Sequence, residues 1–81
     1  MSTPADPTPL GRLAPGDSAT VTRVRCARPV ARRLLEMGLL PGTLVKVLRT
    51  APFGDPVELE LRGYALSIRR AEAMEIDVVP A

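Results

Sequence analysis

The sequence predicts a small, mainly β protein, a barrel of about five short strands with one α-helix inserted after the first strand. Short runs of alternating apolar and polar residues recur between segments rich in proline and glycine, as in strands joined by turns. One segment alone follows the helical period. The 81 residues suit a single domain, and a sheet this small hides its edges best by curling into a barrel.

The N-terminal segment differs in composition from the rest. Pro4, Pro7 and Pro9 lie among small polar residues, and no apolar residue recurs there at a regular period. We therefore expect residues 1–9 to be a flexible Pro-rich tail and residues 10–81 to form the domain. A short anchoring turn is predicted at the start of the domain, from the leucines at positions 10 and 13 and the turn residues 15–17.

The first strand is predicted over Ser18 to Arg25, which is rich in threonine and valine. Val21 and Val24 have opposite parity, so both point inward only if the register shifts between them. We therefore expect a bulge near Thr22 and Arg23.

The helix is predicted from Pro29 to Met37. Proline suits the first helical position, and Gly38 suits the left-handed position just past the end. At 100° per residue the apolar side chains cover an arc of about 160°, with the charged ones opposite. The apolar set is Val30, Ala31, Leu34, Leu35 and Met37, and the charged set is Arg32, Arg33 and Glu36.

The second half of the chain alternates between strands and turns. A strand over Leu44 to Arg49 precedes a loop of proline and glycine at residues 51–56. The two alternating runs on either side of Gly63 predict a β-hairpin over residues 57–69 with one buried face. A single helical turn at residues 71–75 and a last strand containing Ile76 and Val78 complete the fold.

Composition disfavours several classes of function. Histidine is absent and Cys26 is the single cysteine, which leaves few groups for metal binding or for acid–base catalysis near neutral pH. We expect no enzyme, no catalytic residues, no metal site and no cofactor. No segment is long and apolar enough for a membrane helix, and the pattern of a signal peptide is missing, so a cytoplasmic protein without membrane insertion is expected.

Two features that resemble metal ligands have simpler explanations. Cys26 shares strand parity with Val24, which predicts a small buried residue. Glu58 and Glu60 lie on one strand face, where a solvated surface accounts for both. We expect neither to hold a metal ion.

The one charge anomaly is a cluster of arginines before and within the predicted helix. Five arginines lie at positions 23, 25, 28, 32 and 33, with no acidic residue among them. A solvated face is one explanation, and a partner-binding surface that includes Arg28, Arg32 and Arg33 is the other. Nucleic-acid binding is disfavoured because nine acidic residues offset eleven basic ones and stacking aromatics are nearly absent.

The single phenylalanine, Phe53, lies in the loop of proline and glycine. Its ring either folds back onto the barrel or projects outward. If it projects, an apolar docking patch is predicted from Pro52, Phe53, Leu39 and Leu40.

Several motifs together resemble the FeoA family of bacterial ferrous-iron transport accessory proteins. The chain carries RLLEMGLLPGT at residues 33–43, APFGDP at 51–56, LRGY at 61–64, LSIR at 66–69 and LAPGD at 13–17. The resemblance covers about residues 10–79. It implies an SH3-like barrel at the cytoplasmic side of ferrous iron uptake that contacts the FeoB-type membrane GTPase permease, and an association with transition metal ions as a family property.

The alternative is an SH3-like interaction domain related to the C-terminal part of DtxR-type metal-dependent regulators, which also resemble this chain. Those regulators carry an N-terminal helix-turn-helix and metal ligands for which this chain lacks the length and the histidines. Whether the protein activates, stabilises or tethers a transporter stays open. Pairing of a free sheet edge with another copy, giving a homo-oligomer, is also left open.

Overall fold

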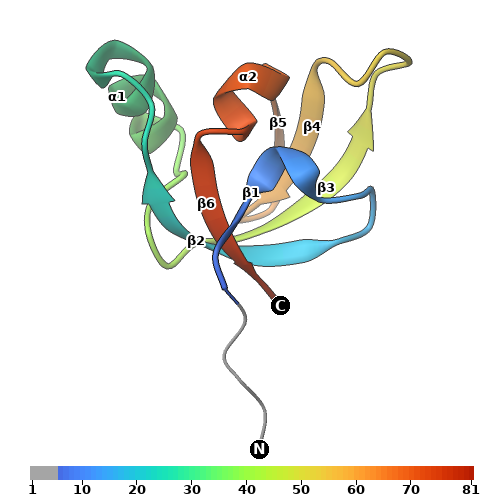
Figure 1. Ribbon diagram of the computed structural model, residues 1–81, viewed down its shortest axis with the longest axis horizontal. Coiled ribbons are helices and arrows are strands. Elements are labelled where there is room, and N and C mark those ends of the chain that lie inside the picture. Colours follow the sequence, from blue (N-terminus) through green and yellow to red (C-terminus); the bar gives the residue numbers. More distant parts are fainter. Residues whose placement is uncertain (1–5) are drawn as a thin grey trace, which may run out of the picture.

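Six strands and three short helical segments make up the computed structural model, which describes residues 6–81 (Figure 1). Most boundaries lie within a residue or two of those predicted from the sequence. The elements are β1 (Thr8–Pro9), the 3₁₀ helix η1 (Leu10–Arg12), β2 (Ser18–Val24), α1 (Arg28–Glu36), β3 (Leu44–Thr50), β4 (Val57–Leu61), β5 (Tyr64–Ile68), α2 (Arg70–Ala73) and β6 (Ile76–Pro80).

All six strands belong to one antiparallel sheet in the order β1-β6-β2-β3-β4-β5. The sheet curls around the core, and α1 and α2 lie at the same end of the molecule (Figure 1). Over residues 6–81 no strand pairing joins β1 to β5, so the sheet stays open at this point. The mainly β fold with its helix inserted after the first long strand is as predicted, with one further short strand.

The prediction of a flexible tail is wrong for residues 8 and 9. Thr8 pairs with Val78 and Pro9 with Asp77, which makes them the edge strand β1. Proline fits there because an edge strand leaves one side without a ladder hydrogen bond. Residues 1–5 lie outside the described part of the chain.

Register shifts explain how the strands curl. The shift between Val21 and Arg23, where β2 pairs with β6, confirms the bulge predicted from the parity of the valines. A second shift, between Val47 and Arg49 on β3, was not predicted. Bulges bend a strand and increase its twist, which is what a small curled sheet needs.

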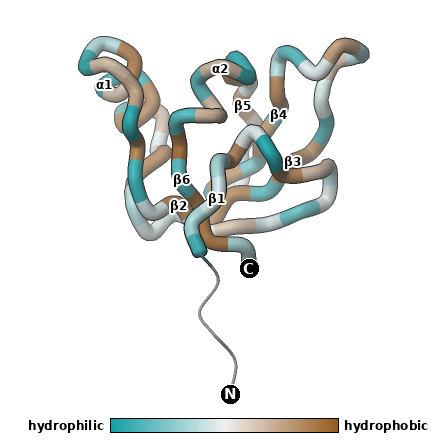
Figure 2. The backbone as a smooth tube through the Cα atoms, viewed as in Figure 1, coloured by the Kyte–Doolittle hydropathy of each residue, from teal (hydrophilic) through white to brown (hydrophobic). Residues whose placement is uncertain are grey.

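The core is a single cluster of aliphatic side chains on the inner face of the sheet. In Figure 2, brown and teal positions alternate along the strands, as expected where one face is buried. The buried apolar residues are Leu10, Ala19, Val21, Leu34, Leu39, Val45, Val47, Val57, Leu59, Leu61, Ile68, Ala73, Ile76 and Val78.

Helix α1 contributes less to the core than its sequence predicted. Leu34 is fully buried, and Val30 and Met37 pack against the core from its edge. Leu35, which the helical wheel placed on the inner arc, is 38% exposed. The helix touches the body of the protein along a narrow stripe, so the end of the predicted apolar arc that carries Leu35 remains outside.

Two tight turns place the helix and the last hairpin. Gly38 ends α1 with a φ of 101°, as predicted. In the β4–β5 turn both central residues have positive φ, 50° for Arg62 and 84° for Gly63, which is the pattern of the type I′ hairpin turn. The hydroxyl of Tyr64, directly after this turn, donates a hydrogen bond to the carbonyl of Met37 and so ties the hairpin to the end of α1.

Candidate partner-binding surface

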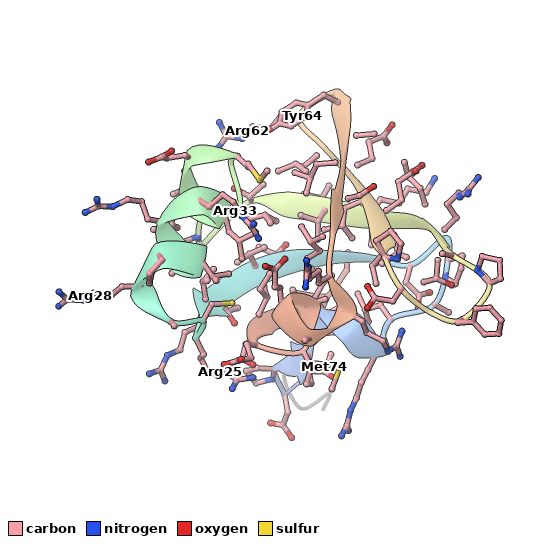
Figure 3. The ribbon with its side chains drawn as sticks, turned by 90° about the horizontal axis from the view of Figure 1, so that it is seen from above. Arg25, Arg28, Arg33, Arg62, Tyr64 and Met74 are labelled. Carbon is pink, nitrogen blue, oxygen red and sulfur yellow. The ribbon has the colours of Figure 1, made fainter. Side chains whose placement is uncertain are left out.

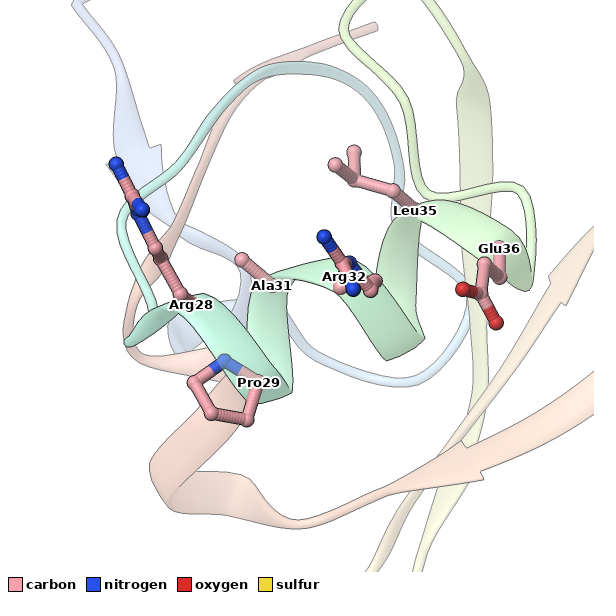
Figure 4. A pocket seen from close by; sticks show the side chains of 6 residues that line it. All are labelled: Arg28, Pro29, Ala31, Arg32, Leu35 and Glu36. Carbon is pink, nitrogen blue, oxygen red and sulfur yellow. The ribbon is translucent and has the colours of Figure 1, made fainter.

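The outer face of α1 carries a hollow lined by both polar and apolar side chains. It measures about 870 Å³, and all of its lining side chains come from this one helix (Figure 4). A helix surface is convex, so the hollow is a shallow, open depression between long side chains. Its lining residues are Arg28, Pro29, Ala31, Arg32, Leu35 and Glu36.

The arginine cluster divides into paired and free members. Arg33 forms an ion pair with Glu72 on α2, and Arg25 forms one with Asp77 at 3.0 Å. The hydrogen bond with Asp77 is the main cause that raises the pKa of Arg25. Arg28 and Arg32 are exposed and have no ion pair within residues 6–81.

Arg28 and Arg33 point in different directions from α1. Figure 3 shows Arg28 extending outward from α1, whereas Arg33 points inward from the helix. Two of the three arginines predicted to bind a partner therefore lie together on the hollow, and the third already has an intramolecular partner. The hollow combines two unpaired cations with the exposed apolar side chain of Leu35.

The predicted apolar docking patch is not assembled as expected. Leu39 is fully buried, so its assignment as a partner-binding residue is wrong. Its backbone N–H donates a hydrogen bond to the carbonyl of Leu34, and its side chain belongs to the core cluster. Leu40, the next residue, is 39% exposed.

Phe53 projects into solvent with 99% of its surface exposed, and Pro52 beside it is also exposed. Their loop joins β3 to β4 and lies at the far side of the molecule from α1 (Figure 1). Phe53 and Leu40 therefore belong to two separate surfaces and not to one patch.

Cys26 is half-buried at the entrance to α1, consistent with a small packed residue. Its thiol lies 3.7 Å from the carbonyl oxygen of Glu72. Burial is the first cause that raises the pKa of this thiol, and the carboxylates of Glu75 and Glu72 add to it. A thiol with a raised pKa is a poor nucleophile and a poor metal ligand.

Candidate metal ligands do not cluster on the described residues. Within residues 6–81 no three cysteine, aspartate or glutamate side chains gather closely enough to hold an ion. Glu58 and Glu60 instead face Arg49 and Lys46 across the β3–β4 pair. In this same part of the chain, none of the helices has the length and the apolar character that crossing a membrane requires.

Sequence reasoning missed Pro29, Ala31, Leu35 and Glu36 as part of the α1 surface. A signal was present, because these residues and the two free arginines recur at intervals of three and four, the spacing that shares one helix face. Sorting the helix residues by polarity alone assigns Ala31 and Leu35 to the core and separates them from the charged residues beside them.

The comparison with known families decides the relationship. The FeoA domain family matches residues 8–80, which is nearly the whole chain. This protein belongs to the FeoA family. The match begins at β1, in agreement with the pairing of Thr8 and Pro9 to β6.

A curated relative of this FeoA-family chain is the Fe(2+) transport protein A/Fe(2+) transporter FeoB fusion protein of Porphyromonas gingivalis. The two are 38% identical over 69 residues, which cover 85% of this chain and 8% of the relative. The chain thus spans a small part of the length of that protein.

Solved structures of FeoA proteins share the fold. The FeoA protein of Chlorobium tepidum is 45% identical with a TM-score of 0.86, covering 90% of this chain and 70% of that one. The FeoA of Stenotrophomonas maltophilia, solved as a complex with zinc and described as a prokaryotic SH3 domain protein, is 29% identical with a TM-score of 0.75 and covers 85% and 86%. The SH3-like fold class is confirmed.

A manganese-dependent transcriptional repressor also contains this fold. Its TM-score is 0.83, and the match covers all of this chain and 45% of the repressor. At 23% identity the likeness shows the fold alone. It agrees with the resemblance to DtxR-type regulators noted from the sequence and adds nothing about their function here.

Proposed function

We propose that this protein is a non-catalytic accessory protein of ferrous iron transport that binds an FeoB-type permease at the cytoplasmic face of the membrane. The supporting observation is the Porphyromonas gingivalis relative, in which the matching segment and an FeoB transporter form one polypeptide. Covalent fusion keeps two domains at a high effective concentration, which favours partners that work in contact.

The outer face of α1 is the proposed contact. Arg28 and Arg32 offer unpaired positive charge, and Leu35, about one turn beyond Arg32 on the same helix, offers an apolar surface. This combination suits a partner surface that carries carboxylates around an apolar centre. Charges at the rim of such an interface speed association and select the partner, and their contribution decreases with salt.

Pro52 and Phe53 are proposed as a second contact with the same partner. Nearly all of the Phe53 surface lies in water, so covering it with a partner lowers the free energy of the complex. Aromatic side chains often anchor interfaces in this way. The two surfaces lie at opposite sides of the molecule, so both contribute only if the partner wraps around the domain or engages it in two places. A Phe53→Ala variant that binds as tightly as the native chain would exclude this second contact.

Binding of the full chain to the full-length FeoB-type transporter of the same organism, at low and moderate salt, tests the proposal. We expect Arg28→Gln with Arg32→Gln to raise Kd about tenfold at low salt and to weaken the salt dependence. The matched control is Arg12→Gln with Arg49→Gln, which removes the same charge from exposed residues on other elements and should change Kd little.

Equal losses in the two double variants would show a general charge effect and would exclude the α1 surface. A native chain that fails to bind the transporter would contradict the accessory role itself.

A further inference from the structure

The sheet ends at two edge strands, and the edge of β5 is the longer one. β5 is last in the strand order and pairs with β4 alone, in the register Val57 to Ile68 through Leu61 to Tyr64. Its free edge faces the side of the molecule on which α1 lies (Figures 1 and 3). The opposite end of the sheet is β1, which has two residues and contains a proline.

The register identifies which backbone groups of β5 are unpaired. Leu61 and Tyr64 close a two-residue turn, so they form a hydrogen-bonded pair, and such pairs alternate along an antiparallel ladder. The N–H and C=O groups of Tyr64, Leu66 and Ile68 therefore face β4. Those of Ala65 and Ser67 face away, and they have no hydrogen-bond partner within residues 6–81.

β5 lacks the features that protect sheet edges from other chains. Natural edge strands carry a charged residue, a proline or a bulge, or they are very short. β5 has five residues, none charged and none proline, and its pairing with β4 shows no register shift. Ala65 and Ser67 are exposed. Two donors and two acceptors at alternate residues match the backbone of an added strand.

The charges at the two ends of β5 indicate what kind of strand fits. Arg62 precedes the strand, and Arg69 and Arg70 follow it. No acidic residue lies between Glu60 and Glu72, and Glu72 is paired with Arg33.

Three carboxylates lie close to this edge: Glu58 opposite Ser67 and Glu60 opposite Ala65 on β4, and Asp55, whose Oδ1 accepts a hydrogen bond from the backbone N–H of Arg70. On their other side Glu58 and Glu60 lie opposite Arg49 and Lys46 of β3, so each has a basic residue beside it. The arginines at positions 62, 69 and 70 outnumber Asp55, and the charge around the free edge is positive on balance.

We propose that the free edge of β5 is a docking site for an extended segment of another protein with carboxylates at both of its ends. A second copy of this chain fits less well. The antiparallel register that would use all four free groups places Arg62 of one copy opposite Arg70 of the other, and like charges in that position repel.

Amide hydrogen exchange of the full-length chain, measured by NMR, tests this directly. The probe is a synthetic peptide with a core of alternating valine and threonine and a pair of glutamates at each end. The control peptide has lysines in place of the glutamates. On adding the probe we expect exchange at Ala65 and Ser67 to slow about tenfold or more, and we expect the lysine peptide to bind about tenfold more weakly.

Two variants separate backbone pairing from side-chain contact. Ala65→Pro removes one outward N–H and leaves the β4 ladder intact, because proline is tolerated where the N–H faces solvent. It should weaken peptide binding about tenfold or more, whereas Ala65→Val, which keeps the N–H, should not. Ser67→Pro provides the same test if the first variant does not fold.

Three results would overturn the proposal. The first is that exchange at Ala65 and Ser67 does not change when the probe peptide is added. The second is that the proline and valine variants bind the peptide equally well. The third is that exchange at these residues slows as the protein concentration rises without peptide, which would indicate pairing with a second copy. The experiment needs no transporter, so its outcome is separate from that of the proposed function.

Discussion

Replacement of Gly38 by alanine tests two demands that the end of α1 places on one residue. Its φ of 101° lies where residues with a side chain are strained, at a cost of about 1–2 kcal/mol. A Cβ atom at this position would also lie 2.7 Å from the hydroxyl oxygen of Tyr64 and 3.3 Å from a methyl carbon of Leu61. Leu61 is buried in the core, so the half-exposed Tyr64 is the side chain that must move.

Moving Tyr64 breaks the hydrogen bond that its hydroxyl donates to the carbonyl of Met37, a loss of about 0.5–1.5 kcal/mol. We expect Gly38→Ala to lower the free energy of unfolding by about 1.5–3.5 kcal/mol, the sum of strain and lost bond. A domain of this length is stable by about 4–12 kcal/mol, so urea denaturation followed by circular dichroism resolves the change.

Gly42→Ala is the matched control, because Gly42 has a similar φ of 92° and no atom within 4 Å of the added Cβ. It should cost the strain alone, about 1–2 kcal/mol. Combining Gly38→Ala with Tyr64→Phe should cost no more than Gly38→Ala by itself, since the tyrosine hydroxyl is already displaced. Equal losses for the two glycine variants, within about 0.5 kcal/mol, would refute the proposed contact with Tyr64.

Three further predictions concern packing and the thiol. Gly11→Ala should lower the free energy of unfolding by about 1–3 kcal/mol in the same assay, because the new Cβ lies 2.7 Å from the sulfur of Met74 and 3.2 Å from its backbone nitrogen. Thr43→Val should raise the melting temperature, since its buried hydroxyl has no partner within residues 6–81 and removing it gains up to about 1 kcal/mol; a lower melting temperature would reveal a partner. The raised pKa of Cys26 means less thiolate in the folded than in the unfolded chain at pH 8, so alkylation by iodoacetamide should be slower without urea than with it, and equal rates would contradict the burial of the thiol.

Local patterns in the sequence were sufficient for most of the fold. Alternation placed the strands, and Pro29 and Gly38 marked the helix ends, because proline and glycine act through their own backbone angles. The opposite parity of Val21 and Val24 located the bulge, since a side chain in a strand points to one face or the other. The motifs in the turns indicated the family, which the match to residues 8–80 confirms.

The candidate surface was predictable only in part. Arg28 and Arg32 were identified by their charge, but the sequence does not show that Arg33 is paired with Glu72, thirty-nine residues away. It also does not separate Leu39 from Leu40, because both follow the helix in a loop that has no period to assign a face. Tertiary packing buries the first and leaves the second exposed.

Local composition determined the elements of this protein, because strands, turns and helix ends depend on residues a few positions apart. Contacts between distant segments determined what the elements expose. Pairing with β6 makes Thr8 and Pro9 an edge strand and not the predicted tail. The close approach of Met74, directly after α2, leaves no room for a side chain at Gly11. The sheet ends at β5, so the outward backbone groups of Ala65 and Ser67 have no neighbouring strand. These outcomes follow from the three-dimensional arrangement of groups that the sequence separates by many residues.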